Sequence, residues 1–480
     1  MGANPTPPAM TNNTFAHPTF GRPIHVTEAR GQFPDIGSTL GPYFCLGQLG
    51  KGTFSSVHKC VNLDFHVQQP PGEEENRRRL PRLAAAKVEL RTFQQSGVLE
   101  SEATILDFLH HSLPPETVPV YMGHYKSTKY AAILMEYLPG EDMNQLREAI
   151  IRQGSTPSRR LHVKDAVYLT ADVFIPQLKR MHSTGLVHRD VKPSNAVRME
   201  STRGSTDSGG EEDHRAKFCL VDFGLSKSVV VPEDSPMADK DHSWPEENVW
   251  LKPANFPGKG FYRKERDKAD FRGSSMYASL RVHQGRDYCA RDDIWSVLYV
   301  FCDLVSGGLP WMSHAANKER NECGFLKEIV QGERKSEEAS DVNIHEDEMA
   351  QLLMGDEYHV AKHRREQKIK AAAKANQPIP PNKLSPLPEP LAIASDEFKV
   401  GCLRKAFAHL ATLQFWDMPD YDLVADCIRG FLKDTSNCPD VNQIQWHELT
   451  SKSSSTFSPS RDPSLSELQN KKRKIPQWNV

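Results

Sequence analysis

The spacing of apolar residues changes near residue 138, and this change limits the fold more than any other feature of the chain. Before it, short segments rich in β-branched and aromatic residues are typical of strands; they are "YFCLGQLG", "SSVHKCVN", "RLAAAKVEL", "VPVYMGHY" and "AAILMEYL". Within the same stretch, "VLESEATILDFLHH" carries apolar residues at helical spacing. We therefore expect a small, mostly antiparallel sheet with one main helix.

Beyond residue 138 the pattern is helical. The segment "KDAVYLTADVFIPQLKRMHSTG" has its apolar residues broadly on one face, and Gly185 follows its last turn, where helices commonly end. The run "IWSVLYVFCDLV" from Ile294 predicts a buried core helix, because it contains Asp303 and falls short of the ~18 apolar residues of a membrane span. The expected fold class is α+β, with a sheet-rich part followed by a larger, mainly helical part.

Charge and cysteine content exclude several classes of protein. The chain has 60 basic and 62 acidic residues, so it lacks the strongly basic balance of a protein that coats nucleic acid. Its N-terminus has no apolar signal-peptide core. The nine cysteines include no C-x-x-C pair, so neither a zinc cluster nor a secreted disulfide framework is expected. We expect a monomeric protein of the cytoplasm or nucleus, with no membrane span.

Polar segments divide the chain into regions. Residues 1–42 are rich in Pro, Asn, Thr and Gly and predict a disordered N-terminal tail. The sheet-rich part then covers 43–138 and the helical part 139–435, with polar inserts near 200–216, 229–268 and 333–392, and residues 436–480 form a Ser-rich and basic tail. Two short motifs remain open: "MGANPT" loosely fits N-myristoylation, and "KKRK" in the tail is either a nuclear import signal or plain tail.

The stretch "LVHRDVKPSN" carries the chemistry. Moving a phosphoryl group needs a carboxylate to orient the attacking hydroxyl, a cation on the transferring phosphate and ligands for magnesium. Asp190, Lys192 and Asn195 supply one of each. The motif "VDFG" follows, so Asp222 is expected to bind the metal together with Asn195. The sequence thus predicts a phosphotransferase that uses Mg²⁺ and a nucleoside triphosphate.

Two upstream motifs supply the nucleotide site. In "LGKGTFSSV", beginning at Leu49, Gly50 and Gly52 allow backbone amides to approach phosphates closely. In "AAAKVE", Lys87 lies on a predicted strand and needs a carboxylate on a helix to direct it to the phosphates. Glu102 suits this role, and Glu100 is the alternative.

Taken together, these motifs resemble those of the eukaryotic protein kinases over about residues 43 to 435. The resemblance implies a bilobal kinase fold and ATP as the phosphate donor, and Lys192 is the form typical of serine/threonine kinases. It also implies an adenine pocket, a gatekeeper and a hinge. The residues implied are Val57, Ala85 and Val197 around the adenine, Met135 as the gatekeeper, and Glu136 and Leu138 in the hinge.

Sequence in the second half resembles one group of kinases. "FRGSSMYASLRVHQGRDYCARDDIWSVLYV", "GGLPWM" and "LQFWDMPDYDLV" are similar to the casein kinase I group, and "FRG", "KPSN" and "DDIWS" favour its tau-tubulin kinase branch. By this resemblance Asp293 braces the catalytic loop. The chain departs from the family pattern at Ser55, where a third glycine is usual, at Met276, where the group usually has Arg, and in an insert of about forty residues after "VDFG".

Two basic residues are candidates for binding an anionic part of the substrate. Arg272 and Lys318 either contact an acidic or phosphorylated segment of a protein substrate or are ordinary exposed charges. Two other functions compete with a protein kinase. The departures at Ser55 and Met276 suit a pseudokinase scaffold, and a small-molecule kinase would share the Asp and Asn of the catalytic loop. Lys192 and "MYASLRVHQG" argue against the small-molecule enzyme.

Overall fold

A computed structural model describes residues 37–52, 55–63, 83–90, 98–126, 130–152, 159–199, 217–232, 260–263, 265–331, 348–377, 379–380 and 383–433. The chain divides into two compact units. The sheet unit comprises residues Met1–Phe108 and Pro119–Tyr137, and the helical unit comprises Leu109–Val118 and Leu138–Val480. The predicted insert at 200–216 lies outside the described residues. The C-terminal tail with its "KKRK" motif and Gly2 also lie outside them.

The sheet unit contains one antiparallel sheet of six strands in the order β1-β2-β3-β4-β6-β5. Its strands are β1 (Thr39–Leu40), β2 (Tyr43–Lys51), β3 (Ser55–Asn62), β4 (Leu83–Leu90), β5 (Tyr121–Lys126) and β6 (Tyr130–Glu136). The helix α1 (Val98–Ser112) follows β4 in the chain. The predictions of an antiparallel sheet and one main helix are therefore confirmed.

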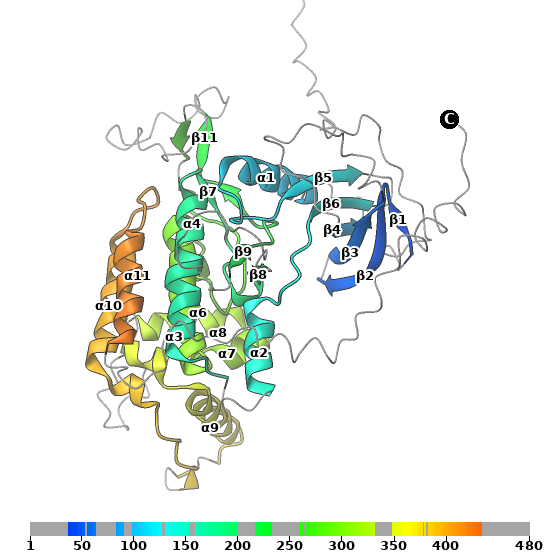
Figure 1. The fold of residues 1–480 in the computed structure, drawn as a ribbon. Helices are drawn as coiled ribbons and strands as arrows, with labels where there is room; N and C mark the ends of the chain where they lie inside the picture. Colours follow the sequence, from blue (N-terminus) through cyan, green and yellow to red (C-terminus); the bar gives the residue numbers. More distant parts are fainter. Residues whose placement is uncertain are drawn as a thin grey trace, which may run out of the picture. The chain divides into compact units, whose positions relative to one another are not determined.

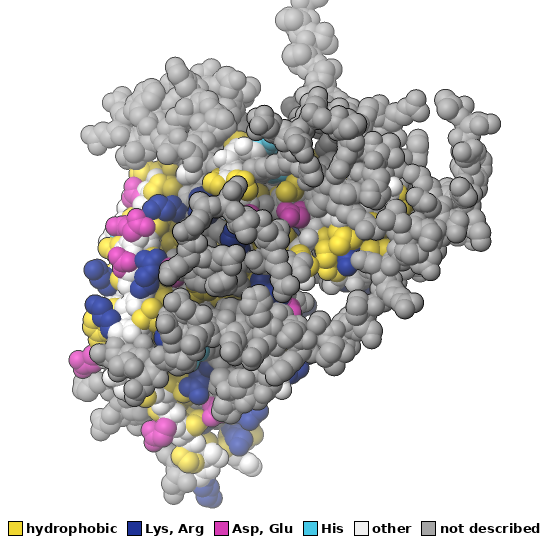
Figure 2. Space-filling model, viewed as in Figure 1, with side chains coloured by type: hydrophobic (Ala, Val, Ile, Leu, Met, Phe, Trp, Pro, Cys, Tyr) yellow, Lys and Arg dark blue, Asp and Glu magenta, His cyan; other side chains and the backbone are white. Residues whose placement is uncertain are grey.

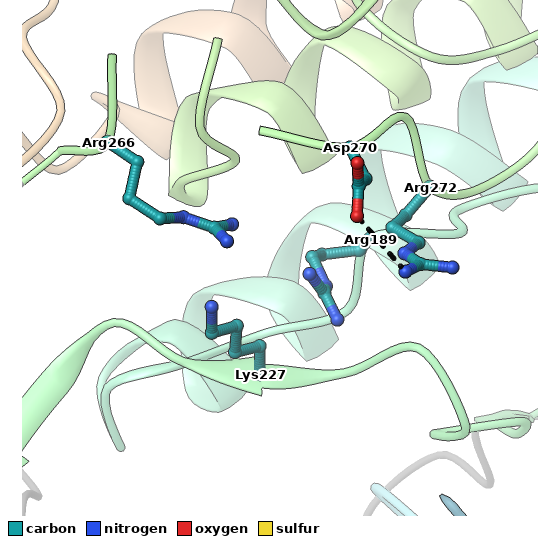
Figure 3. A pocket seen from close by; sticks show the side chains of 5 residues that line it. All are labelled: Arg189, Lys227, Arg266, Asp270 and Arg272. Carbon is teal, nitrogen blue, oxygen red and sulfur yellow. Dashed lines mark ion pairs between the residues drawn. The ribbon is translucent and has the colours of Figure 1, made fainter. Parts of the chain in front are cut away.

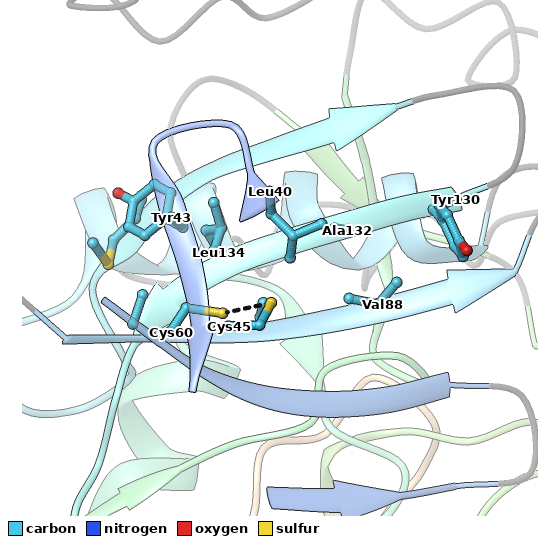
Figure 4. Packing of buried hydrophobic residues seen from close by; sticks show 11 residues of the cluster. Leu40, Tyr43, Cys45, Cys60, Val88, Tyr130, Ala132 and Leu134 are labelled. Atoms are coloured by element: carbon cyan, nitrogen blue, oxygen red, sulfur yellow. Dashed lines mark hydrogen bonds between the residues drawn. The ribbon is translucent and has the colours of Figure 1, made fainter. Parts of the chain in front are cut away.

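Apolar side chains on one face of this sheet form a closed core. Leu40, Tyr43, Cys45, Cys60 and Val88 are buried in it, and the Cys45 and Cys60 thiols lie 3.5 Å apart on neighbouring strands (Figure 4). The prediction of a disordered tail up to residue 42 is wrong for residues 37–42. Leu40 is fully buried against this core and fixes β1. Because its neighbours in the sequence are not apolar, the sequence pattern did not predict this strand.

The helical unit is built around α6 (Ala290–Ser306), all of whose residues are buried. The other segments are α2 (Met143–Arg152), α3 (Val163–Val167), η1 (Tyr168–Phe174), α4 (Ile175–His182), η2 (Pro193–Asn195), α5 (Leu280–His283), α7 (Met312–Ala316), α8 (Arg320–Val330), η3 (Glu348–Leu353), α9 (Asp356–Lys374), η5 (Ala392–Ser395), α10 (Glu397–Thr412), α11 (Tyr421–Arg429) and η6 (Gly430–Leu432). The predicted helix around 164–185 is one run of α3, a π-helical segment η1 and α4. It packs beside α11 (Figure 1).

The polar residue Asp303 in α6 does not interrupt the core, because it is paired. Arg147 of α2 donates two side-chain hydrogen bonds to its carboxylate, at 2.6 Å to Oδ2 and 3.2 Å to Oδ1. Both side chains are only 1% exposed. A buried pair of this kind fixes the register of α2 against α6. Separating the two side chains would leave an unpaired buried charge, which costs ~3–5 kcal/mol.

Short strand pairs connect the helices. These are β7 (Leu186–Val187) with β10 (Lys227–Ser228), β8 (Ala196–Arg198) with β9 (Phe218–Leu220), and β11 (Val230–Pro232) with β12 (Gly260–Tyr262). The insert near 229–268 is thus not wholly irregular, because β11 and β12 pair at its two ends.

The insert near 333–392 contains a helix, α9, and it also contributes to the core. Leu352 and Leu353 of η3 are fully buried, although the surrounding polar sequence predicts only a surface loop. Basic and acidic side chains are interspersed along the edge formed by α10 and α11 (Figure 2), in keeping with the nearly balanced charge of the chain. Among the described helices, none combines the length and the apolar character needed to cross a membrane.

Candidate active site

The catalytic loop is held by a single buried carboxylate on α6. Asp293 accepts hydrogen bonds from the backbone amides of His188, at 2.7 Å, and Arg189, at 2.9 Å. The ring of His182 and the hydroxyl of Tyr288 contact the same carboxylate at 2.9 and 3.0 Å. Four contacts to one buried group fix the loop that carries Asp190, as the resemblance implies for Asp293.

The loop passes through an uncommon backbone conformation next to the reacting carboxylate. Arg189 has φ of 67°, in the left-handed region that a residue with a side chain rarely adopts. The hydrogen bond from the Arg189 amide to the Asp293 carboxylate compensates for this backbone strain of ~1 kcal/mol or more. Asp222 has a similar φ of 66°. Backbone strain of this kind is concentrated at functional sites in folded proteins.

Asp190 has both carboxylate oxygens engaged. Lys192 Nζ donates to Oδ2 at 2.6 Å, while Ser274 donates to Oδ1 from its amide at 2.9 Å and its hydroxyl at 2.8 Å. Gly273 allows this approach: it has φ of 90°, and a Cβ there would collide with the carbonyl oxygen of Arg189. The carboxylate is 8% exposed, so its orientation is set by these contacts rather than by solvent.

Asn195 and Asp222 lie on adjoining pieces of backbone. The side-chain amide nitrogen of Asn195 donates to the carbonyl of Asp190 at 2.9 Å, and its backbone carbonyl accepts from the amide of Val221 at 3.0 Å. Because the nitrogen is used, the amide oxygen is the atom that can bind a metal. An amide oxygen and the exposed carboxylate of Asp222 fit Mg²⁺, which is typically held by one or two protein oxygens, phosphates and water.

His188 supports the same arrangement. Its ring lies 3.2 Å from the carbonyl of Val221 and 5.5 Å from the ring centre of Phe223. The histidine therefore links the catalytic loop to the "VDFG" turn and has a packing role. In the part of the chain that the structure describes, no cluster of three or more His, Cys, Asp or Glu side chains could hold a metal by itself.

In the sheet unit, the structure pairs Lys87 with Glu102. Lys87 Nζ lies 2.8 Å from each carboxylate oxygen of Glu102, whose side chain is 4% exposed. The alternative, Glu100, contacts Lys126 at 2.9 Å. The strand β4 and the helix α1 thus hold a lysine amine in a fixed position.

The predicted nucleotide residues of the sheet unit lie on adjacent strands. Val57 is opposite Gly50 on one side and Lys87 on the other, and Ala85 is opposite Met135. Leu49 is exposed at the end of β2, and Gly52 follows that strand. Glu136 ends β6. Leu138 and Val197 belong to the helical unit, so an adenine pocket that combines them with Val57 and Ala85 stays a prediction.

A basic cavity of about 250 Å³ lies in the helical unit, lined by Arg189, Lys227, Arg266, Asp270 and Arg272. Lys227 rises from β10 toward the guanidinium groups of Arg189 and Arg266, and Asp270 is paired with Arg272 (Figure 3). Arg272, predicted as an anion contact, lines this cavity, whereas Lys318 is not one of the lining residues.

Charge around the cavity favours an anion. Burial, followed by the charges of Arg263 and Arg266, lowers the pKa of Lys227 to about 8. The Asp287 carboxylate accepts hydrogen bonds from both arginines, at 2.6 Å from Arg263 and 2.9 Å from Arg266, and so fixes Arg266 at the cavity. Despite the burial of its side chain, the hydrogen bonds from Arg266 and Arg263 lower the pKa of Asp287 well below its usual range.

Sequence reasoning missed three of the residues described above. Arg189 and Lys227 each adjoin a recognised motif, and this proximity was the available signal for a basic site. Ser274 gave no signal, because a serine in a polar run is common and only the fold brings it to Asp190.

Comparison with known proteins agrees with this architecture. The family model of the protein kinase domain matches residues 43–374. An antiparallel sheet unit, a helical unit and a catalytic loop anchored on a buried helix are the elements of that domain. The chain therefore belongs to the protein kinase family, and the predicted α+β kinase fold is confirmed.

Individual relatives are serine/threonine kinases by name. A probable serine/threonine-protein kinase of Dictyostelium discoideum is 28% identical over 292 residues, covering 60% of this chain and 45% of that protein. A probable casein kinase I homolog of Encephalitozoon cuniculi is 27% identical over 202 residues, covering 42% of this chain and 54% of that protein. The Caenorhabditis elegans serine/threonine-protein kinase spe-6 is 23% identical over 215 residues, covering 45% of each. The chain spans about half the length of these relatives.

Proposed function

We propose that this protein is an active serine/threonine kinase that transfers the γ-phosphoryl group of ATP to hydroxyl groups of protein substrates. The observation that carries the proposal is the state of Asp190: its carboxylate is fixed between Lys192 and Ser274 on a loop anchored by Asp293. A scaffold without catalysis would have no need of a carboxylate in this orientation. The order of Asp190, Lys192 and Asn195 along the loop supports the same function.

Each residue has a defined task in the proposed reaction. Asp190 orients the attacking hydroxyl and accepts its proton, and Lys192 offsets negative charge on the transferring group. Lys87, fixed by Glu102, contacts the α- and β-phosphates. Asn195 and Asp222 supply oxygen ligands for Mg²⁺, which neutralises phosphate charge when it is bound.

The substrate class follows from the resemblance and from the basic cavity. We assign the chain to the casein kinase I group, nearest its tau-tubulin kinase branch, and the named casein kinase I homolog among its relatives supports the group. The cavity lined by Arg189, Lys227 and Arg272 suits an acidic or phosphorylated segment. We place the enzyme in the cytoplasm or nucleus as a monomer.

Incubation of the purified full chain with Mg²⁺, labelled ATP and casein tests the function. We expect labelled phosphoserine or phosphothreonine in the wild type and loss of label in Lys87→Met. Absence of transfer by the wild type, with nucleotide still bound, would favour the scaffold. Labelling of an aminoglycoside but not of any protein would instead identify a small-molecule kinase.

A further inference from the structure

The helix α8 carries a lysine in an unusual environment. Lys327 is 0% exposed, and among the residues that the structure describes no carboxylate pairs with it. Fully buried lysines are rare unless they are paired, because removing an ammonium group from water costs several kcal/mol. Burial lowers the pKa of this amine well below its usual range. A methionine of similar size would fill the same space at lower cost, so the amine itself needs an explanation.

The amine is surrounded by acceptors from one short segment of chain. Lys327 Nζ lies 2.8 Å from the carbonyl oxygen of Ser275 and 2.5 Å from that of Ala278. The ring nitrogen Nε2 of His283 lies 3.2 Å away. A charged amine has three N–H donors and a neutral amine has two. The two carbonyl bonds therefore persist in either protonation state.

The segment in question, residues 274–278, is also held from other directions. Trp311 donates from its indole nitrogen to the carbonyl of Met276 at 2.7 Å, and Tyr277 donates from its hydroxyl to Asp303 at 2.9 Å. The Lys327 amine lies 4.8 Å from the centre of the Trp311 ring and 5.0 Å from that of Tyr299. Aromatic faces at this distance favour a cation. The backbone of the segment is thus fixed residue by residue.

The first residue of the same segment contacts the catalytic carboxylate. Ser274 donates from both its amide and its hydroxyl to Asp190 Oδ1. Two turn bonds within the segment, from the amides of Tyr277 and Ala278 to the carbonyl of Ser274, connect this residue to the part that Lys327 holds. Displacement of Ala278 or Ser275 would therefore move Ser274.

We propose that Lys327 is a positioning residue of the phosphotransfer reaction, which holds residues 274–278 so that Ser274 orients Asp190. This inference rests on the proposed kinase function. Lys327 does not touch the reacting groups and acts through the segment. Its loss should lower turnover much more than nucleotide binding, because a catalytic group displaced by about 1 Å can cost up to ~100-fold in rate.

Lys327→Met tests the proposal against a control residue that directly follows the last residue of α8. Gln331, one turn further along, donates to the hydroxyl of Tyr299 at 3.0 Å and has no hydrogen bond to the 274–278 segment in the described structure. In full-length protein, we expect Lys327→Met to lower kcat for a peptide substrate at least about tenfold, with the Kd for Mg-ATP within about twofold of wild type. Gln331→Met should leave both quantities within about twofold. Equal kcat in Lys327→Met and wild type would overturn the proposal.

A double-mutant cycle separates positioning from a general loss of stability. Once Ser274→Ala has removed the hydroxyl contact, Lys327→Met should cost distinctly less than it does alone, since both changes act on one chain of contacts. If the double variant loses kcat by the product of the two single-variant losses, the link through Ser274 is rejected. Trp311→Phe provides a second variant if Lys327→Met does not fold. It removes the indole bond to the Met276 carbonyl and shortens the ring that faces the Lys327 amine, so it should reduce kcat in the same pattern, and an unchanged kcat would count against the proposal.

The same assays distinguish failure of the proposed kinase function from failure of the proposed role of Lys327. A wild type that binds Mg-ATP but transfers no phosphate rejects the proposed function and this inference with it. An active wild type with an equally active Lys327→Met variant rejects only the role of Lys327.

Discussion

Ser274 donates two hydrogen bonds to one oxygen of Asp190, from its amide at 2.9 Å and from its hydroxyl at 2.8 Å. The two residues are 84 positions apart in the chain. Since Lys192 occupies the other oxygen, the carboxylate is held in one plane, ready to accept a proton from a substrate hydroxyl. The orientation of Asp190 is therefore a property of the fold as well as of the local motif.

Replacing Ser274 by Ala should reduce turnover. The change removes the hydroxyl contact and leaves the amide contact, and a hydrogen bond to a charged group contributes ~1.5–3 kcal/mol. We expect kcat to fall about tenfold and the thermal midpoint of unfolding to fall by a few degrees. Steady-state kinetics on a serine peptide measures this. Ser275→Ala is the control, since Lys327 binds only the backbone carbonyl of that residue.

The pairing of Lys87 with Glu102 predicts different effects at two neighbouring glutamates. Glu102→Gln removes the charge that fixes Lys87, so we expect kcat/KM for ATP to fall at least about tenfold, as for a lost charged hydrogen bond. Glu100→Gln weakens the exposed contact with Lys126 and should stay close to wild type. Equal losses in both variants would contradict the assignment of Glu102.

Asp293 should be important for stability and for its pH dependence. Burial alone would raise the pKa of Asp293, but the hydrogen bonds from His182 and from the His188 amide lower it below its usual value. A carboxylate with a lowered pKa stabilises the fold at neutral pH, and this contribution is lost as the pH falls through the folded-state pKa. Asp293→Asn should therefore lower the free energy of unfolding at pH 7.5 by ~3 kcal/mol or more.

Urea unfolding at several pH values checks this prediction. The difference between wild type and Asp293→Asn should begin to narrow below about pH 4, where the unfolded chain binds a proton at this carboxylate, and should narrow further as the pH falls through the lower folded-state pKa. Tyr288→Phe, which removes one of the contacts to the carboxylate, should cost about 1.5–3 kcal/mol. A difference that does not change with pH would show that the charge of Asp293 is unimportant.

The basic cavity predicts a pH-dependent affinity for phosphorylated peptides. A phosphoserine is almost fully ionised above pH 7. Lys227, with a pKa of about 8 in the empty cavity, loses its charge as the pH rises further. Binding of a phosphoserine peptide should therefore weaken several-fold between pH 7 and pH 9.5, with a midpoint above 8 because a bound anion favours the charged amine. In Lys227→Met the affinity should be lower and nearly constant over this range. Titration calorimetry would measure both.

The catalytic loop and the positions of the strands along the chain were predictable because local sequence determines them. "HRDVKPSN" and "VDFG" contain their own chemistry, and the alternation of apolar residues in 43–62 predicted β2 and β3 closely. Helical spacing favoured Glu102 over Glu100 as the partner of Lys87 but did not exclude Glu100, since both glutamates lie in the first turns of α1.

Other features depend on contacts between distant parts of the chain. Leu40 is a single apolar residue among glycine, proline and polar residues, and Leu352 lies in a short apolar stretch within a polar insert, so only tertiary packing reveals that they are buried. Lys327 has the sequence context of an ordinary exposed helix lysine. The residues that line the cavity around Lys227 are spread between positions 189 and 272. Their charges come together only when the segment preceding Gly273 folds against the catalytic loop.

Asp190→Asn tests the central claim most directly. The change keeps the size of the side chain, so Mg-ATP should bind with a Kd within about threefold of wild type, whereas single-turnover transfer of labelled phosphate to a serine peptide should fall by at least about 100-fold. Transfer at the wild-type rate by a folded, nucleotide-bound Asp190→Asn protein would contradict the assignment of Asp190 as the catalytic base.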